Sequence, residues 1–316
     1  MAQMDGAFII DKPAGLTSHD VVARVRKIIG ERRVGHTGTL DPFATGALVI
    51  LVGRATRLAQ FLNGAEKEYA GAIRLGYATD TGDVTGERLT DDSTTEARTT
   101  TELHREEIEA ALKTLRGEIE QTPPMYSAKK VGGRKLYELA RRGEQVERLP
   151  VRITVSELEA IPMDGSFFKA NDDETADLRV RVVCSAGTYI RTLAEDLGKQ
   201  LRVGAHLVEL RRMRAGHFRI EDALTLKRLA ELSESDLVET KVIPPDAVLS
   251  HLPAIELTAD EVTRTIHGIE MSVAKDFDWT NGQAVRMRSA DNQLIAVGTY
   301  DESRSVLHPK VVIAAR

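Results

Sequence analysis

The sequence predicts an α+β protein in two parts: a large domain over residues 1–250 and a small β-rich module over residues 251–316. Three observations lead to this prediction. Strand-like and helical patterns follow one another along residues 1–250. The composition then shifts where Pro244-Pro245 and Pro253 frame a linker. Beyond the linker, short strand patterns follow closely, which is typical of a small β module.

Strands in the large domain are predicted where apolar residues alternate or form a short run. The segments are residues 8–10, 46–53, 67–75, 151–155, 178–182 and 205–214. In residues 67–75, Tyr69, Ile73 and Leu75 share one face, so core packing is one possible role for Tyr69. The run 46–53 is bounded by glycines and reads as a buried strand.

Helices are predicted where apolar residues recur at helical spacing. The first begins with the N-cap candidates Thr17–Asp20 and ends at Gly30. The other helical segments are residues 54–62, 99–116 and 135–142, and a helix capped by Gly187-Thr188. Residues 35–46, 79–92 and 121–133 are rich in Gly, Pro, Thr or Asp and are predicted to be loops. The small module is predicted to hold a helix over 259–267 and strands over 283–289, 294–301 and 306–313.

The composition narrows the class of protein. A single cysteine, Cys184, excludes a disulfide framework within the chain and argues against a thiolate metal site. The N-terminus has no basic region followed by a long apolar stretch, so we expect no signal peptide. The longest apolar run is too short to span a membrane. The sequence therefore predicts a cytoplasmic protein without a membrane segment.

The charge is unevenly distributed. The net charge is −5, yet Lys129–Arg152 carries eight basic and three acidic residues, and Arg202–Arg219 carries five basic and one acidic. Such segregation can give an acidic protein a basic, nucleic-acid-binding face, although charge runs are also common on solvated helix faces. The acidic stretch Asp91–Glu107 has no predicted role.

The segment Gly35–Gly46, GHTGTLDPFATG, is the most informative loop. Its three glycines let the backbone approach a ligand closely. Pro42 restricts both itself and Asp41, and an Asp held in this way is ionised at neutral pH and can act as a nucleophile or base. From the residues alone, an ordinary Asp-Pro turn is the better explanation of the pattern, because such turns are common.

This loop resembles the catalytic loop of the TruB family of tRNA pseudouridine synthases. Further motifs of the family occur in the same order. They are Ile10–Gly15, which contains its Lys-Pro motif, Lys67–Tyr69 with Gly76–Asp83, Cys184–Leu193, and Gly204–Arg212. The tail resembles, more weakly, the small C-terminal RNA-binding barrel of the family, the PUA domain. The resemblance implies a long mixed, mostly antiparallel sheet flanked by helices in residues 1–250, the pseudouridine synthase fold, and a PUA-like barrel in residues 251–316.

The resemblance also implies the function: conversion of the T-loop uridine at tRNA position 55 to pseudouridine. Asp41 matches the catalytic aspartate, which attacks C6 of the base or assists at C1′ of the ribose. The substrate-binding positions that match the family are Tyr69, Tyr189, Arg191, Leu210 and His36. Tyr69 is expected to stack on the target base, Arg191 to pair with the aspartate, Tyr189 and Leu210 to line the uracil pocket, and His36 to insert near the flipped nucleotide.

The reaction gains and loses no atoms, so no redox cofactor or metal is expected. A uridine stacked in a folded loop must leave the stack, at a cost of a few kcal/mol. The basic segment matches a family insertion, here about residues 121–150, that clamps the T-arm. We expect a monomer that binds tRNA and needs no protein partner.

Three alternatives remain at the level of sequence. A non-catalytic chaperone would bind and remodel tRNA, and an enzyme could do both. A synthase guided by a partner RNA–protein complex would have less need of its own clamp. A metal-free hydrolase using Asp41 would release free uracil, which an isomerase does not.

Overall fold

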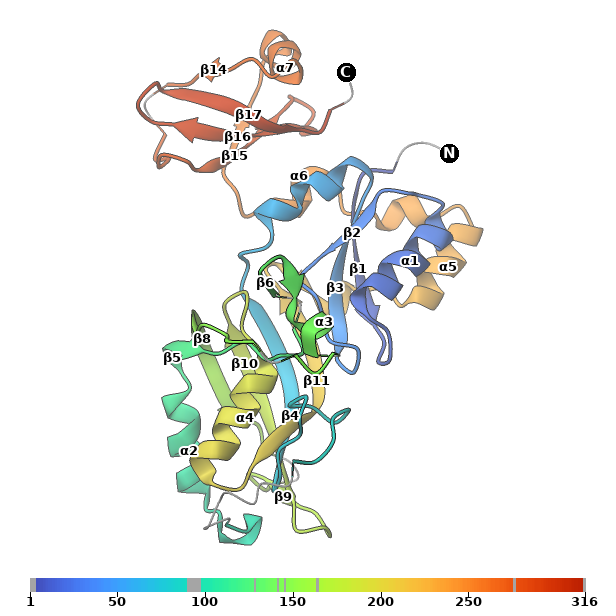
Figure 1. Cartoon of the computed structure of the whole chain (residues 1–316). Helices are drawn as coiled ribbons and strands as arrows, with labels where there is room; N and C mark the ends of the chain where they lie inside the picture. The colour runs from blue at the N-terminus through green and yellow to red at the C-terminus, as the bar shows by residue number, and fades with distance from the viewer. Residues whose placement is uncertain are drawn as a thin grey trace.

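A computed structural model describes residues 4–89, 98–127, 129–140, 142–144, 146–162, 165–274 and 277–314. The large domain is built on one extended sheet, and the C-terminal module stands at one end of it (Figure 1). The first part of the acidic stretch, residues 91–97, and Arg141 in the basic segment lie outside the described residues.

The main sheet follows the order β1-β3-β11-β4-β10-β8-β5. Every pairing along this path is antiparallel except that between β3 and β11. The predicted mixed, mostly antiparallel sheet is therefore confirmed. Its strands are β1 (Gly6–Lys12), β2 (Val34–Thr37), β3 (Thr45–Val52), β4 (Lys67–Leu75), β5 (Gly117–Gln121), β8 (Val151–Ala160), β9 (Lys169–Ala170), β10 (Ala176–Cys184), β11 (Ala205–Ala215) and β12 (Phe218–Arg219).

Four helices share one face of this sheet and enclose the main core. The α-helices of the chain are α1 (Ser18–Ile29), α2 (Arg105–Thr114), α3 (Leu136–Ala140), α4 (Ile190–Leu201), α5 (Leu226–Glu234), α6 (Pro245–Val248) and α7 (Ala259–Ile266). In the main core α1, α2, α4 and α5 contribute buried side chains. Helix α1 begins with a capping box between Thr17 and Asp20 and ends at Gly30 in the left-handed region, as its sequence predicts.

The opposite face of the sheet is divided in two. Near β1 and β3 it is covered by the 3₁₀ helix η1 (Gly53–Phe61), by α6 and by the C-terminal module, which meet in a second apolar core. Along β4, β10 and β11 the same face carries ion pairs, among them Arg74–Asp177 and Arg181–Glu68. The covered half of the sheet thus connects the two parts of the chain, and the other half is solvated.

The C-terminal module is a five-stranded half-barrel with its own small core, which matches the predicted barrel-like architecture. Its strands are β13 (Ala254–Glu256), β14 (Met271–Ser272), β15 (Ala284–Arg288), β16 (Leu294–Asp301) and β17 (Val306–Val312). Hydrogen bonds and ion pairs also fasten it to the large domain. Arg286 pairs with Asp246 at 2.8 Å, and Arg57 donates to the carbonyl of Val312 at 2.6 Å.

Several boundaries differ from the predictions. Residues 35–37 of the predicted loop belong to β2, because they pair with β3. The helix predicted over 99–116 is broken by extended Leu103 into the 3₁₀ helix η2 (Thr100–Glu102) and α2. The helix predicted over 54–62 is the 3₁₀ helix η1. Helix α4 has Tyr189 as its N-cap, without a side-chain cap, in place of Gly187-Thr188.

Smaller elements complete the chain. A short hairpin of β6 (Lys130–Val131) and β7 (Arg134–Lys135) leads into α3, within the basic segment. The 3₁₀ helices η3 (Ile220–Asp222) and η4 (Val238–Lys241) flank α5. In Figure 1 the hairpin and α3 lie over the middle of the sheet, beside the strand β11.

Candidate active site

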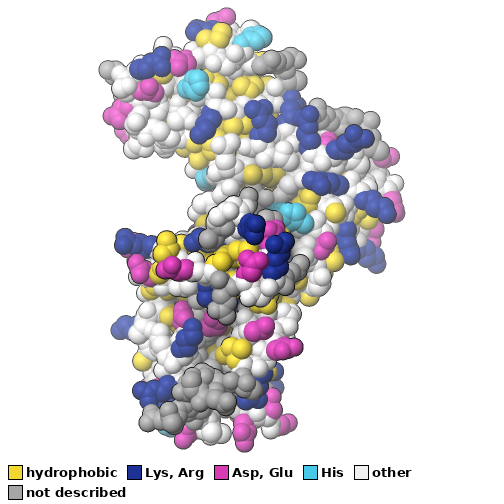
Figure 2. Space-filling view, viewed as in Figure 1, with side chains coloured by type: hydrophobic (Ala, Val, Ile, Leu, Met, Phe, Trp, Pro, Cys, Tyr) yellow, Lys and Arg dark blue, Asp and Glu magenta, His cyan; other side chains and the backbone are white. Residues whose placement is uncertain are grey.

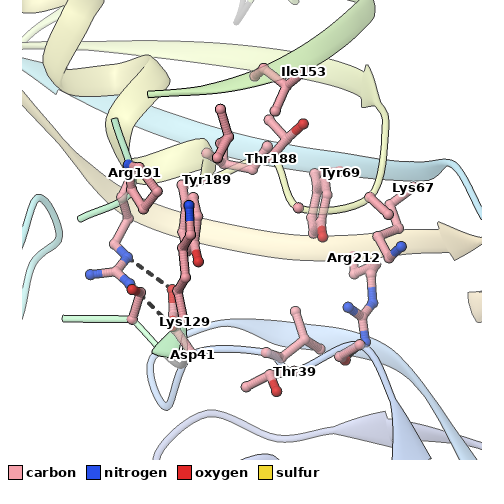
Figure 3. Close-up of a pocket in the computed structure, with 18 of the residues that line it drawn as sticks. Thr39, Asp41, Lys67, Tyr69, Lys129, Ile153, Thr188, Tyr189, Arg191 and Arg212 are labelled. Atoms are coloured by element: carbon pink, nitrogen blue, oxygen red, sulfur yellow. Dashed lines mark hydrogen bonds and ion pairs between the residues drawn. The ribbon is translucent and has the colours of Figure 1, made fainter. Parts of the chain in front are cut away.

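A cavity of about 590 Å³ opens at the middle of the sheet, where the loop after β2, the strands β4 and β11 and the start of α4 meet. Figure 3 shows ten of its lining residues. The cavity is bounded by Gly38, Thr39, Leu40, Asp41, Asn63, Lys67, Tyr69, Pro123, Ser127, Lys129, Val151, Arg152, Ile153, Ala186, Gly187, Thr188, Tyr189, Ile190, Arg191, Leu210 and Arg212. Five of the six predicted site residues therefore share one cavity.

Asp41 and Arg191 form a two-pronged ion pair in this cavity. Arg191 Nε lies 2.9 Å from Asp41 Oδ2, and its Nη2 donates to Oδ1 at 3.3 Å. Burial of the carboxyl raises the pKa of Asp41, and the guanidinium of Arg191 opposes that rise. The Asp41 side chain keeps 34% of its surface exposed, so it remains accessible to a substrate. The predicted pairing of Arg191 with Asp41 is present.

Arg191 is held on its other sides by groups that sequence reasoning did not single out. It donates to the carbonyls of Thr81 at 2.8 Å and Tyr126 at 2.7 Å. The buried carboxylate of Asp83 lies 3.7 Å from its Nη1. Asp83 is the last residue of the Gly76–Asp83 motif, and its place in that motif was the feature of the sequence that could have identified it as a site residue. A guanidinium fixed by four partners can hold the Asp41 carboxylate in one orientation.

Tyr69 and Leu210 form the apolar wall of the cavity. They lie on the neighbouring strands β4 and β11, and each is 7% exposed. Both also belong to the main core, so each of these two residues packs in the core and lines the cavity as well. Burial raises the pKa of Tyr69, which keeps its phenol protonated at neutral pH. A flat ring facing a cavity can stack on a base, a contact worth about 1–3 kcal/mol.

Tyr189 is positioned by a side chain at the end of a neighbouring strand. The amide of Gln121 donates to the Tyr189 carbonyl at 3.0 Å and accepts from the Tyr189 N–H at 2.8 Å. Gln121 is 1% exposed. Its side-chain amide bonds both main-chain groups of Tyr189, as the backbone of a neighbouring strand would do. Nothing in the sequence had distinguished Gln121 from other residues of the irregular stretch that was expected around it.

His36 lies beside the cavity and does not line it. It sits on β2, where its ring meets that of His19 edge-on at 5.3 Å between centroids. Burial lowers the pKa of His36 to about 4, so it is neutral at neutral pH. A neutral imidazole can enter an RNA stack more readily than a charged one, because no charge has to be desolvated.

Lys12 supports the loop that carries Asp41. It is fully buried, and its Nζ donates to the carbonyls of Pro13, Leu16 and Pro42 at 3.0, 2.7 and 3.2 Å. Burial lowers the pKa of Lys12 to about 8, although the negative charge of Asp41 acts to raise it. Three acceptors for three N–H donors are the arrangement that an ammonium requires. The Lys-Pro motif contained this residue, but no role had been assigned to it.

The surroundings of the cavity are basic although the chain is acidic. The lining includes Lys67, Lys129, Arg152, Arg191 and Arg212, against the single acid Asp41. Figure 2 shows Lys and Arg side chains crowding the region between the C-terminal module and the N-terminal half of the sheet, and charges of both signs on the lower half. A polyanion is therefore favoured at this face.

Two features are absent from the described residues. No group of three or more His, Cys, Asp or Glu side chains is arranged to hold a metal ion there. Within the same ranges, no helix combines the length and apolar character that crossing a bilayer requires.

Comparison with known proteins gives matches along most of the chain. Residues 26–190 match the model of the TruB family pseudouridylate synthase N-terminal domain, and residues 191–250 match the tRNA pseudouridylate synthase B C-terminal domain. Proteins named tRNA pseudouridine synthase B are similar to it. The one from Geobacillus thermodenitrificans is 46% identical over 263 residues, which is 83% of this chain and 84% of that protein. The one from Thermobifida fusca is 42% identical over 98% of this chain and 99% of that protein.

Solved structures with the same fold include a Cbf5–Nop10–Gar1 complex and an archaeal box H/ACA sRNP Nop10–Cbf5 complex. The first matches with a TM-score of 0.73 and 27% identity, over 98% of this chain and 85% of that one. The second matches with a TM-score of 0.71 and 26% identity, over 98% of this chain and 86% of that one.

Proposed function

The chain belongs to the TruB family of pseudouridylate synthases, and from this premise we propose that it converts the T-loop uridine at tRNA position 55 to pseudouridine in the Asp41 cavity. As a tRNA pseudouridine synthase it is an isomerase. The observation that carries the proposal is the two-pronged Asp41–Arg191 pair facing Tyr69 and Leu210 in a single cavity. This arrangement supplies a carboxylate, a fixed orientation for it and a surface on which a base can stack.

The proposed chemistry follows from these positions. The flipped uridine stacks on Tyr69, and Asp41 acts at C6 of the base or at C1′ of the ribose. The N1–C1′ bond breaks, the base turns, and C5 joins C1′; the proton leaves C5 and N1 gains one, so the atoms balance. Arg191 keeps Asp41 aimed at the substrate throughout. Tyr189 closes the pocket beside the ring, and His36 takes the space in the RNA that the flipped base leaves.

We propose that the chain recognises tRNA by itself. Lys129 and Arg152 lie at the cavity from the basic segment, and the β6–β7 hairpin and α3 stand over the same region. Contacts with phosphates there would position the T-arm without reading its sequence. The solved relatives named above are complexes with other proteins, whereas we propose a cytoplasmic monomer for this chain.

A tRNA transcript labelled with tritium at C5 of its uridines tests the proposal. Isomerisation breaks the C5–H bond at the target, so we expect a single equivalent of tritium to enter water. A matched transcript with cytidine in place of uridine 55 should release none. Release from both transcripts would contradict position 55, and free uracil in the products would indicate hydrolysis.

A further inference from the structure

Arg212 is a buried cation without an acidic partner. It lies on β11 and is 0% exposed. Its Nε donates to the Ala47 carbonyl at 2.7 Å, and its Nη2 donates to the Gly38 carbonyl at 3.0 Å. Its Nη1 has no hydrogen-bond partner, and within the described parts of the chain no carboxylate pairs with it. By contrast, Arg191, Arg211 and Arg214 each hold a carboxylate.

Burying the Arg212 guanidinium without a carboxylate lowers the stability of the folded chain. Removing a charge from water costs several kcal/mol even after the protein relaxes, and an apolar residue of similar volume is often more stable at such a site. Two carbonyl acceptors recover only part of that cost, and the unpaired Nη1 adds to it. A residue that stability alone would not select is expected where function requires it.

The position of Arg212 shows what it can influence. On β11 it lies directly across from Tyr69 on β4, and on its other side it pairs with Gly46 on β3. In Figure 3 the hydroxyl end of Tyr69 points toward Arg212. A Cβ placed on Gly38 would lie 3.5 Å from Nη1, so the guanidinium also sits directly beneath the loop that carries Asp41. Arg212 therefore touches both sides of the catalytic cavity.

Direct contact with the RNA is a poorer explanation for this residue. The side chain is fully buried, and its free Nη1 has almost no exposed surface. Lys67 and Lys129, which also line the cavity, are the more accessible cations for phosphate binding.

We propose that Arg212 is a positioning residue that acts through Tyr69, fixing the phenol hydroxyl relative to the Asp41 loop and favouring electron density on its oxygen. The inference rests on the proposed function, because it assumes that Tyr69 contacts the target base. Burial raises the pKa of Tyr69, and the charge of Arg212 works against that rise. A hydroxyl held in this way keeps one orientation, and the neighbouring cation lets it give up its own proton more readily.

The test compares Arg212→Met, Arg212→Lys and the control Arg211→Met. Arg211 is the next residue along β11, has 41% of its side chain exposed and pairs with Asp11. Three quantities are measured: stability in urea, binding of the T-arm transcript, and the single-turnover rate of tritium release. For Arg212→Met we expect stability equal to or above wild type, binding within about threefold, and a rate about 100-fold lower.

Arg212→Lys keeps the charge, and its rate should be at least about tenfold higher than that of Arg212→Met. The rate of the control Arg211→Met should stay within about threefold of wild type. A wild-type rate for Arg212→Met would overturn the inference. Loss of rate that simply parallels loss of stability would also overturn it, since that result assigns Arg212 a structural role alone.

A double-mutant cycle with Tyr69→Phe tests whether Arg212 acts through the phenol. Once the hydroxyl is absent, the Arg212 substitution should lower the rate by less than about threefold, and an undiminished effect would contradict the proposal. If Arg212→Met does not fold, Arg212→Lys takes its place in the same cycle. Failure of the proposed function is a different result, in which the wild-type chain releases no tritium from tRNA.

Discussion

At the residue scale, the site is built from charges whose partners differ. Arg191 is neutralised by Asp41 and Asp83, whereas Lys12 and Arg212 hold backbone carbonyls only. Cations that pair with carboxylates and cations that bond only to carbonyls have different roles here. The neutralised pair presents a carboxylate to the substrate, and the two other cations hold the loop at Pro42 and Gly38, on either side of Asp41.

Lys12 gives a prediction for stability against pH. Its pKa falls from its ordinary value of 10.5 in the unfolded chain to about 8 in the folded one. Between these values the unfolded chain binds more protons, so the contribution of Lys12 to stability rises as the pH increases through that window. In Lys12→Met this dependence disappears. Urea unfolding at pH 7.5 and pH 10 should show a difference between wild type and variant that changes by roughly 1–3 kcal/mol.

A difference that stays constant with pH would show that the Lys12 ammonium is not desolvated by folding. Lys27 at the end of α1 provides the matched control, because its side chain is exposed to solvent. Lys27→Met should give the same pH dependence as wild type.

The sequence predicted five residues that share the cavity but not the residues that hold them in place. Asp41, Tyr69 and Arg191 could be found because each occupies a family motif and has a distinctive chemistry. Gln121 and Arg212 act on main-chain groups far away in sequence, and such contacts leave no local pattern. His36 was predicted with the others, yet it lies on β2 beside the cavity, because the start of the loop pairs with β3.

At the element scale, the cavity depends on how the end of one strand fixes the start of a helix. Gln121 at the end of β5 holds the main chain of Tyr189 at the N-cap of α4, and α4 supplies Arg191. Regular periodicity predicted β4, β10, β11 and α4 well, because each has a buried face. It failed at η2 and β5, where the segments are short and mostly exposed.

Gln121→Glu should weaken this connection. A carboxylate cannot donate to the Tyr189 carbonyl, which then keeps only the N–H of Leu193 as its donor, and the new charge lies in a buried position; we expect the two effects together to cost about 1–3 kcal/mol. We expect that loss in urea unfolding and a raised KM for the T-arm transcript, since Tyr189 lines the pocket. Glu120→Gln, on the exposed side of the same strand, is the control and should change neither value. An unchanged KM in Gln121→Glu would mean that Tyr189 is positioned by other contacts.

At the scale of the whole molecule, the two parts of the chain share an apolar core. Side chains of η1 and α6 pack with those of β16 and β17 from the C-terminal module. The prolines and the change of pattern predict a boundary near residue 250. The shared core was not predictable. Each of its elements is amphipathic on its own, and the sequence does not indicate which apolar faces pack together.

Asp246 is the polar centre of this junction. It pairs with Arg286 at 2.8 Å and lies 3.6 Å from Arg288, with 17% of its side chain exposed. Asp246→Ala leaves two half-buried cations unpaired, at a cost of about 3 kcal/mol. We expect calorimetry to show one unfolding transition for wild type and two for the variant, because the module then unfolds first. Glu302→Ala, in an exposed turn of the module, should keep the single transition; two transitions in wild type would contradict a shared core.

We propose that the Asp41 carboxylate performs the isomerisation in this cavity. The most direct measurement is single-turnover tritium release from a T-arm transcript labelled at uridine C5, with wild type, Asp41→Asn and the control Asp196→Asn. Asp196 has a similarly exposed side chain but does not line the cavity. We predict release by wild type and by Asp196→Asn, and a rate lower by about 1,000-fold or more in Asp41→Asn, with transcript binding within about threefold. Release by Asp41→Asn at the wild-type rate, or loss of binding together with activity, would contradict this role for Asp41.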